Sequence, residues 1–313
     1  MSFTIRDARP QPFAAAKYIL TEDLRAAVET AIALGQPLLV TGAPGTGKTE
    51  LAFKVAADLA ADNAKHGLNF APEPLIFNTK TTAESRDLFY TYDALSHFRA
   101  ANLPGASTEE VAVDNFLELQ ALGLAIARSN EGTPPANALK GEEFTGESTV
   151  VLIDEIDKAP RDLPNDLLNE IKHYKFNVKE QGNREIKANP ERRIVLIMTS
   201  NSEKNLPNAF LRRCVFHHIE LPDPDTLLRI AKAQLGGHNK FTETALKTLI
   251  GRFTQVQGMD LRKAPSTAEL IAWLRMLAVV QPSGVLDQGE VSLDKLSLLV
   301  KTAEDRKKLL ELI

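Results

Sequence analysis

The sequence has little of what marks secreted or membrane-embedded proteins. Cys214 is the only cysteine, which excludes a disulfide within the chain and fits a reducing compartment. No apolar run approaches the ~20 residues that a helix needs to span a bilayer, and the start Met1-Ser2-Phe3-Thr4-Ile5-Arg6 lacks the apolar core of a signal peptide. We therefore expect a cytoplasmic protein without membrane insertion.

A large excess of charge of either sign is also missing. The 313 residues include 37 Lys and Arg against 41 Asp and Glu, a formal net charge of −4. This balance gives no overall signature of nucleic-acid binding, although it does not exclude a local basic patch. With 43% hydrophobic and 25% charged residues, the composition is that of a globular chain with room for one large and one small domain.

The most informative segment is a glycine-rich loop that follows a short apolar run and precedes a helical pattern. It matches G-x-x-x-x-G-K-[ST] and consists of Gly42, Ala43, Pro44, Gly45, Thr46, Gly47, Lys48 and Thr49. In such a loop, backbone N–H groups and the positive end of the following helix surround phosphate groups. Lys48 then reaches the β and γ oxygens, and the Thr49 hydroxyl binds Mg²⁺. The loop predicts a nucleoside triphosphate site, and we count Glu50 with the nucleotide-binding residues.

Five short apolar runs, often rich in β-branched residues, alternate with helical patterns along the chain. They cover residues 37–41, 75–78, 150–154, 194–199 and 215–221. Before the first run, a helix is predicted between the N-cap Thr21 and the closing Gly35. This alternation predicts a five-stranded parallel sheet covered by helices on both faces, an α/β fold.

Two segments interrupt this pattern. The stretch between Lys80 and Thr149 is too long for a simple crossover, so we predict a helical insert over about 81–145, with helices at 88–98 and 111–128. At about 174–188, Phe176 and Val178 alternate with polar residues before the turn Gln181-Gly182-Asn183, which predicts a β-hairpin.

The hairpin region is locally basic. Residues 172–193 hold seven Lys or Arg against three Glu, an excess of four positive charges. Such an excess suits nucleic acid or an acidic protein surface, and it is equally typical of a solvated hairpin.

A domain boundary is predicted near Asp223, because the flanking Pro222 and Pro224 interrupt regular secondary structure. Residues 1–222 then form the nucleotide-binding domain, and 223–313 a helical domain. Its helices are predicted at 226–235, 242–253 and 266–280, with a final one from about Leu293. Ser266 and Glu269 match a capping box at the third of these.

Polar residues follow two of the apolar runs and extend the predicted nucleotide site. Asp154 and Glu155 end the run 150–154, where Asp154 can hold Mg²⁺ and Glu155 can orient and polarise an attacking water. Asn201 follows 194–199 and brings a neutral amide to the same edge of the sheet. Exposed strand ends and turns also favour such residues, and it is the phosphate loop upstream that favours the catalytic interpretation.

Basic residues near two helix ends are candidates for contacts to the transferred phosphoryl group. Arg212 and Arg213 precede the last strand, and Arg262 and Lys263 precede the helix at 266. A guanidinium or ammonium there can neutralise charge that develops on the phosphoryl group. Surface charges at a helix terminus are the alternative for each pair.

Taken together, the order of these motifs resembles the AAA+ ATPases, and within them the MoxR family, over essentially the whole chain. The segments that carry the resemblance are residues 36–49, 115–124, 153–160 and 206–213. The resemblance implies an AAA+ P-loop fold: a five-stranded αβα sandwich followed by a small all-helical lid domain. It makes Arg213 the arginine finger, with Arg212 as the alternative, Asn201 sensor 1 and Lys263 sensor 2. Asn78 would restrain the catalytic Glu155.

The resemblance also implies ATP hydrolysis with Mg²⁺ in a ring, expected to be a hexamer, and a protein partner, often one with a von Willebrand factor A domain. Our first hypothesis is therefore an oligomeric ATPase that remodels or activates a protein. The second is a nucleic-acid motor of a restriction or defence system, which the basic hairpin motivates. A small-molecule kinase shares the phosphate loop, but Glu155 as a base and a separate helical lid disfavour it.

Overall fold

The computed structural model describes residue 8 and residues 12–104, 107–202, 206–236, 241–280 and 298–310. Its contacts divide the chain into two compact units. The sheet unit comprises Thr21–Thr41 and Lys48–His218. The helical unit comprises Met1–Leu20, Gly42–Gly47 and Ile219–Ile313, as far as these ranges are described. The phosphate loop thus belongs to the helical unit, while Lys48 and Thr49 belong to the sheet unit.

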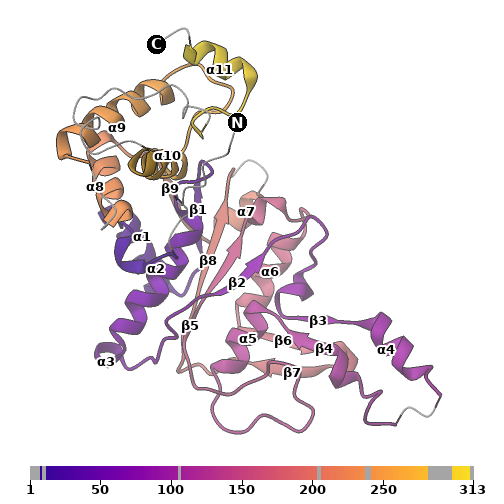
Figure 1. Cartoon of the computed structure of the whole chain (residues 1–313). Helices are drawn as coiled ribbons and strands as arrows, with labels where there is room; N and C mark the ends of the chain where they lie inside the picture. Colours follow the sequence, from indigo (N-terminus) through magenta and orange to yellow (C-terminus); the bar gives the residue numbers. More distant parts are fainter. Residues whose placement is uncertain are drawn as a thin grey trace. The chain divides into compact units, whose positions relative to one another are not determined.

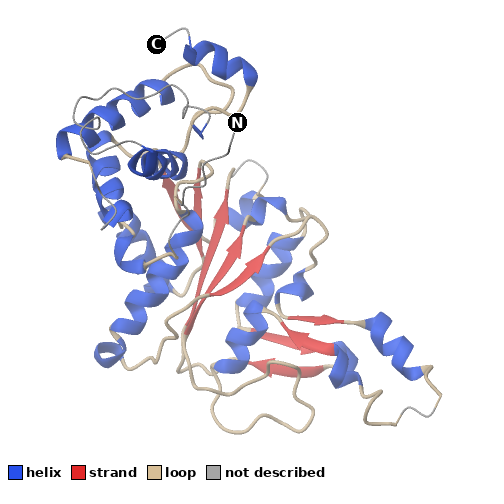
Figure 2. Cartoon of the chain, in the orientation of Figure 1, coloured by secondary structure: helices blue, strands red, loops and turns tan. Residues whose placement is uncertain are grey.

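A five-stranded parallel sheet forms the centre of the fold, and all five predicted strands are confirmed (Figures 1 and 2). In spatial order the strands are β2 (Leu75–Asn78), β5 (Thr149–Asp154), β8 (Ile194–Ser200), β1 (Leu38–Gly42) and β9 (Val215–Ile219). The central strands β5, β8 and β1 are almost entirely buried, which explains their continuous apolar runs.

Helices cover both faces of this sheet. Figure 1 shows α1 (Glu22–Leu34) and α2 (Lys48–Ala61) on one face, and α5 (Ala121–Arg128), α6 (Leu163–Ile171) and α7 (Asn208–Leu211) on the other. A short α3 (Asn63–His66) follows α2. The predicted ends of α1 are confirmed, since the Thr21 hydroxyl accepts from the Leu24 N–H and Gly35 is left-handed at φ 61°. No helix in the described ranges is both long and apolar enough to cross a bilayer.

The insert between β2 and β5 is only partly helical, so the prediction of helices at 88–98 and 111–128 is wrong in part. The segment contains η2 (Ser85–Leu88), β3 (Tyr90–Tyr92), α4 (Ala94–Ala101), η3 (Val113–Phe116), β4 (Leu117–Leu119) and α5. The strands β3 and β4 pair antiparallel. Aromatic residues favour strands, and both Tyr90 and its register partner Leu119 are buried. The tertiary burial of this pair therefore overrides the helical spacing.

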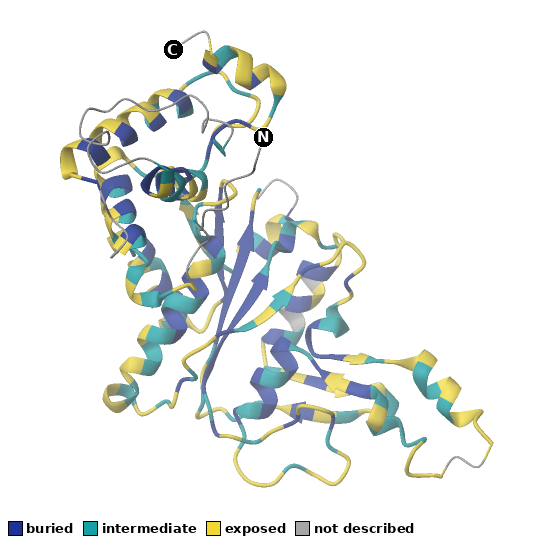
Figure 3. Cartoon of the chain, viewed as in Figure 1, coloured by how far each residue is buried: buried dark blue, intermediate teal, exposed yellow. Residues whose placement is uncertain are grey.

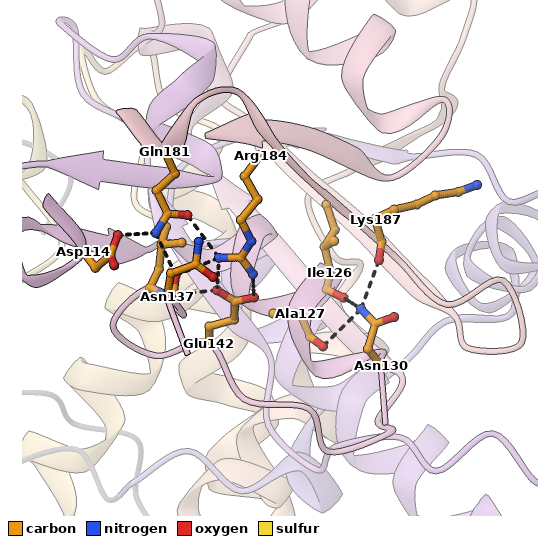
Figure 4. A network of polar contacts seen from close by, with 10 residues as sticks. Asp114, Ile126, Ala127, Asn130, Asn137, Glu142, Gln181, Arg184 and Lys187 are labelled. Atoms are coloured by element: carbon orange, nitrogen blue, oxygen red, sulfur yellow. Dashed lines mark hydrogen bonds and ion pairs between the residues drawn. The ribbon is translucent and has the colours of Figure 1, made fainter. Parts of the chain in front are cut away.

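The predicted hairpin is confirmed. Strands β6 (Lys175–Val178) and β7 (Arg184–Lys187) pair antiparallel and are joined by η5 (Lys179–Gln181) and Gly182, which is left-handed at φ 65°. Buried Phe176 stacks on Tyr90 with ring centroids 6.0 Å apart, so one face of the hairpin packs on the insert. The polar face is linked to the loop before β5, as Figure 4 shows for Arg184 and Glu142.

In the described part of the helical unit, four helices follow the short η1 (Ala15–Lys17). They are α8 (Pro224–Leu235), α9 (Glu243–Gln257), α10 (Thr267–Val280) and α11 (Ala303–Leu310). The core of this unit includes the completely buried Phe253 and Leu274, with Trp273 at 1% exposure. Glu269 accepts a hydrogen bond from the Ser266 N–H at 2.7 Å, as expected for a capping box. The predicted helix start at Leu293 lies outside the described residues.

Candidate functional site

Five of the predicted site residues meet at the carboxyl edge of the sheet. The ammonium of Lys48, at the start of α2, donates to Oδ1 of Asn201 at 2.9 Å. The hydroxyl of Thr49 donates to both carboxylate oxygens of Asp154, at 3.1 and 3.2 Å. The amide of Asn201 donates to Oε1 of Glu155 at 3.4 Å. The ends of β5 and β8 and the first turn of α2 thus form one connected polar cluster within the sheet unit.

The environment of Lys48 suits an anionic ligand. Its side chain is buried, and this burial lowers the pKa of the ammonium, while the carboxylates of Asp154, Asp157 and Glu155 oppose that shift. A phosphate group at this lysine would add negative charge and favour the ammonium form. The cluster therefore places a partly desolvated cation where the phosphate loop ends.

Glu155 has an unusual backbone and a cationic neighbour. Its φ of 56° and ψ of 50° lie in the left-handed region, which residues with a Cβ rarely adopt. Lys158, in η4 (Ile156–Lys158), forms an ion pair with Oε2 of Glu155. The hydrogen bond from Lys158 holds the pKa of the Glu155 carboxyl below its ordinary value, and the same contact raises the pKa of Lys158. Glu155 is thus held as a carboxylate, the form a general base requires.

Magnesium fits the oxygen donors at this edge. The Thr49 hydroxyl and the Asp154 carboxylate are hard oxygen ligands, which Mg²⁺ prefers, and they already contact each other. Within the described ranges, no group of three or more His, Cys, Asp and Glu residues is arranged to hold a metal ion. This small donor set is typical of magnesium that is held by one or two protein groups together with phosphates and water.

The phosphate loop itself has a conformation that requires glycine at two positions. Gly45 and Gly47 are left-handed, at φ 75° and 89°. A Cβ on Gly45 would lie 2.5 Å from Oγ of Ser266, and one on Gly47 would lie 3.2 Å from the ring of Tyr18. The Gly45 carbonyl also accepts a hydrogen bond from the Ala268 N–H at 3.2 Å. In the helical unit, the loop therefore packs against the start of α10 and the segment before α1.

Within the described residues, the two candidate finger arginines form no hydrogen bond or ion pair with this polar cluster. Arg212 and Arg213 follow α7 and are both exposed. In the part of the chain that the structure describes, neither forms an ion pair or contacts Glu155. Their role therefore stays a prediction.

The last two candidates, Asn78 and Lys263, lie in the sheet unit and the helical unit, respectively. Asn78 ends β2, is exposed and is the register partner of Asp154. It makes no hydrogen bond to Glu155 among the described residues. Lys263 is exposed in the helical unit, just after Arg262, whose N–H donates to Asp305 at 2.9 Å. Both assignments stay predictions.

Sequence reasoning missed three residues at these sites. Thr199 contacts both Asp154 and Glu155, and it is the observed strand order, with β8 beside β5, that brings it next to Asp154. Asp157 accepts a hydrogen bond from the Asn201 N–H at 3.3 Å. Tyr18 borders the phosphate loop from a segment with no motif of its own.

The sheet order, the phosphate loop and the acids at the strand ends define a P-loop nucleoside triphosphatase fold of the α/β class. Residues 37–214 match the family model described as the AAA domain of the dynein-related subfamily, and the chain belongs to this family. It is an AAA+ ATPase with a five-stranded αβα sandwich and a C-terminal helical region.

Comparisons with known proteins give only distant likenesses beyond the family. Among solved structures, a single-residue variant of Thermotoga maritima RuvB aligns at 17% identity and a TM-score of 0.45, covering 86% of this chain and 67% of that one. The FIGL-1 AAA domain in complex with ADP aligns at 17% identity and a TM-score of 0.45, covering 99% and 87%. A search of curated proteins finds no match.

Proposed function

We propose that this protein is a Mg-ATP-dependent AAA+ ATPase of the MoxR type, which remodels or activates a protein partner from within an oligomeric ring. The observation that carries the proposal is the polar cluster of Lys48, Thr49, Asp154, Glu155 and Asn201 at one edge of the sheet. These five residues supply a phosphate ligand, two magnesium ligands, a base and an amide that contacts both the base and the phosphate ligand.

Each side chain has a role that its contacts support. Lys48 binds the β and γ phosphates, to which it offers a partly desolvated ammonium. Thr49 and Asp154 would hold Mg²⁺, which when bound neutralises the charge of the phosphate oxygens. Glu155 takes a proton from the attacking water, and Asn201 orients the same carboxylate through its amide.

The surface of the insert and hairpin favours a protein partner over nucleic acid. Three of the seven cations counted at 172–193 are paired with acids: Lys175 with Glu185, Arg184 with Glu142, and Arg192 with Glu131. Figure 3 shows α4 and the segment after it in the colours of exposed and intermediate residues. Three large apolar side chains are exposed there: Leu95 at 58%, Phe98 at 68% and Leu103 at 64%. Exposed apolar groups suit a protein surface, and the three ion pairs reduce the positive charge that a polyanion could bind.

The proposal includes a ring, expected to be a hexamer, in which Arg213 acts on the nucleotide of the neighbouring subunit. Its exposure and its lack of an acidic partner among the described residues support this role. Lys263 would contact the nucleotide from the helical unit, and Asn78 would restrain Glu155. The partner is proposed to be a protein, of which a von Willebrand factor A domain is the expected kind.

The first test measures both ATP hydrolysis and nucleotide binding in three variants. Lys48→Ala should abolish binding and turnover, whereas Glu155→Gln should bind ATP and stop turnover. Lys54→Ala, on the same helix but paired with Asp58 at 2.8 Å, is the matched control and should behave as the unaltered protein. Normal turnover by Glu155→Gln would refute its assignment as the base.

The second test separates the two kinds of partner. The ATP-bound Glu155→Gln protein is purified from its native host, and the material that co-elutes is identified by mass spectrometry and nuclease treatment. A defined polypeptide supports the proposal. Stimulation of hydrolysis by duplex or single-stranded DNA at low salt would instead support the nucleic-acid motor.

A further inference from the structure

Thr199 lies at the centre of the hydrogen bonds that join the two acids of the candidate site. Its side chain is completely buried in β8, one residue beyond the register pair of Ile153 with Met198. Its Oγ1 accepts a hydrogen bond from the Glu155 N–H at 2.9 Å and donates one to Oδ1 of Asp154. One hydroxyl thus contacts both the proposed metal ligand and the backbone of the proposed base.

The bond to Glu155 supports a backbone conformation that is otherwise unfavourable. The left-handed φ of 56° turns the chain out of β5 immediately after Asp154. At this turn the Glu155 N–H leaves the ladder of the sheet, and a partly buried N–H without an acceptor is destabilising. The Thr199 hydroxyl supplies the acceptor and so favours the turn that aims the Glu155 side chain along the sheet edge.

The hydrogen bond from Thr199 to Asp154 adds a second hydroxyl that restricts the orientation of this carboxylate. Thr49, on α2, donates to the same carboxylate at 3.1 and 3.2 Å. Hydroxyls from α2 and β8 therefore hold Asp154 between them. Partners of this kind, which orient a metal-binding carboxylate without binding the metal, tune affinity and activity at metal sites.

We propose that Thr199 is a positioning residue for nucleotide hydrolysis, whose hydroxyl fixes Asp154 for magnesium and Glu155 for the attacking water at the same time. This inference rests on the ATPase function proposed above. It differs from the role of Asn201, because Thr199 is buried and acts only through the two acids.

The chain offers variants that isolate the hydroxyl. Thr199→Val keeps the shape and removes the hydroxyl, whereas Thr199→Ser keeps the hydroxyl. Thr149→Val is the matched control, since Thr149 is completely buried at the opposite end of β5 and its hydroxyl has no hydrogen-bond partner among the described residues.

Three measurements are made on these variants: steady-state hydrolysis against Mg²⁺ concentration, affinity for a fluorescent ATP analogue without Mg²⁺, and hydrogen exchange of the Glu155 amide in the nucleotide-free protein. For Thr199→Val we expect turnover to fall about 10- to 100-fold and a higher Mg²⁺ requirement, as for other residues that orient metal ligands. Analogue affinity without Mg²⁺ should stay unchanged, and the Glu155 amide should exchange faster. Thr199→Ser and Thr149→Val should resemble the unaltered protein in all three.

Unchanged turnover and unchanged exchange in Thr199→Val would overturn the inference, and so would a Thr199→Ser protein as slow as Thr199→Val. If Thr199→Val does not fold, Thr199→Ala takes its place in the same comparison with Thr199→Ser. An unaltered protein without turnover would contradict the proposed function instead. In that case, the exchange rate of the Glu155 amide still tests the positioning role of the hydroxyl.

Discussion

At the residue scale, the ion pair between Lys158 and Glu155 determines how the proposed base responds to pH. The pKa of Glu155 lies below its ordinary value, chiefly because Lys158 donates a hydrogen bond to its carboxylate. The carboxylate therefore stays ionised at lower pH than that of a free glutamate. As pH falls, hydrolysis should be lost only when the pH passes through this lowered pKa.

Replacing Lys158 should shift the pH at which hydrolysis is lost on the acid side of the pH profile. In Lys158→Met the pKa of Glu155 rises toward its ordinary value, so the acid limb of the profile of kcat against pH should shift to higher pH. Lys158→Arg keeps the charge and the donor and should keep the limb in place. The measurement is kcat from about pH 3 to 7, a range that covers the titration of a glutamate with the ordinary pKa of about 4.3 and extends below it. If the acid limbs of the kcat profiles are identical in Lys158→Met and Lys158→Arg, the ion pair between residue 158 and Glu155 does not form during turnover.

Single residues were predictable where a local pattern carries the chemistry. Lys48 and Thr49 follow from the spacing of the glycine-rich loop, and Asp154 from its place after a buried strand. Thr199 and Tyr18 could not be predicted in this way. The role of Thr199 depends on which strands are neighbours in the sheet. The role of Tyr18 depends on how a segment distant in sequence packs against the phosphate loop. A short sequence pattern encodes neither.

At the element scale, the phosphate loop has no room for a side chain at Gly45. Its φ is 75°, and a Cβ would come within 2.5 Å of Oγ of Ser266. Gly45→Ala should therefore weaken nucleotide binding and destabilise the fold by about 1–2 kcal/mol, the usual difference for a left-handed residue that gains a Cβ.

Gly251→Ala is the matched control for that substitution. Gly251 lies within α9, and a Cβ there would meet no heavy atom within 4 Å. Alanine should stabilise this helix by about 0.5–1 kcal/mol and leave nucleotide binding unchanged. Binding is measured by titration with a fluorescent nucleotide and stability by urea unfolding. Equal affinity of both variants would contradict the steric argument.

A second element-scale prediction concerns the attachment of the hairpin. Arg184 of β7 forms an ion pair with Glu142, whose side chain is completely buried, and its second contact to this carboxylate is 3.1 Å long (Figure 4). Arg184→Met leaves a buried carboxylate without its cation, which should cost about 3–5 kcal/mol of the free energy of unfolding.

The control for Arg184 is on the neighbouring strand. Lys175 pairs with Glu185 at 2.6 Å, but both side chains are more than 40% exposed. Lys175→Met should therefore change stability little, because water screens exposed pairs. Urea unfolding followed by circular dichroism measures both variants. Similar losses in the two would mean that the buried pair contributes no more than the exposed one.

Elements were predictable where burial on both faces or a clear turn determines them. The five strands and the hairpin follow from continuous or alternating apolar residues. The insert was mispredicted because Tyr90 and Leu119 pair across 29 positions of sequence, and this pairing outweighs the helical spacing around them. Long-range pairing of this kind cannot be read from the local pattern.

At the scale of the whole molecule, the proposed ring requires that one subunit complete the site of the next. Arg212 and Arg213 are exposed and do not contact Glu155 of their own chain in the described part. If Arg213 acts on a neighbour, an active site needs Glu155 from one subunit and Arg213 from another. Arg213→Ala should then reduce kcat by about 10³-fold or more, as for other arginine fingers, and leave ATP affinity nearly unchanged. Arg212→Ala should have a smaller effect.

Mixing two inactive variants tests whether the arginine acts between subunits. Arg213→Ala retains Glu155, and Glu155→Gln retains Arg213, so a mixed ring contains interfaces at which both groups are intact. Hydrolysis should therefore reappear when the two proteins are mixed, pass through a maximum near equal proportions and fall on dilution as the assembly dissociates. A mixture of Lys48→Ala with Glu155→Gln is the control: the Lys48→Ala subunits cannot bind ATP and the Glu155→Gln subunits cannot hydrolyse it, so no interface is complete. Absence of recovery in the first mixture, with assembly verified by light scattering, would restrict Arg213 to its own chain or exclude it from the reaction.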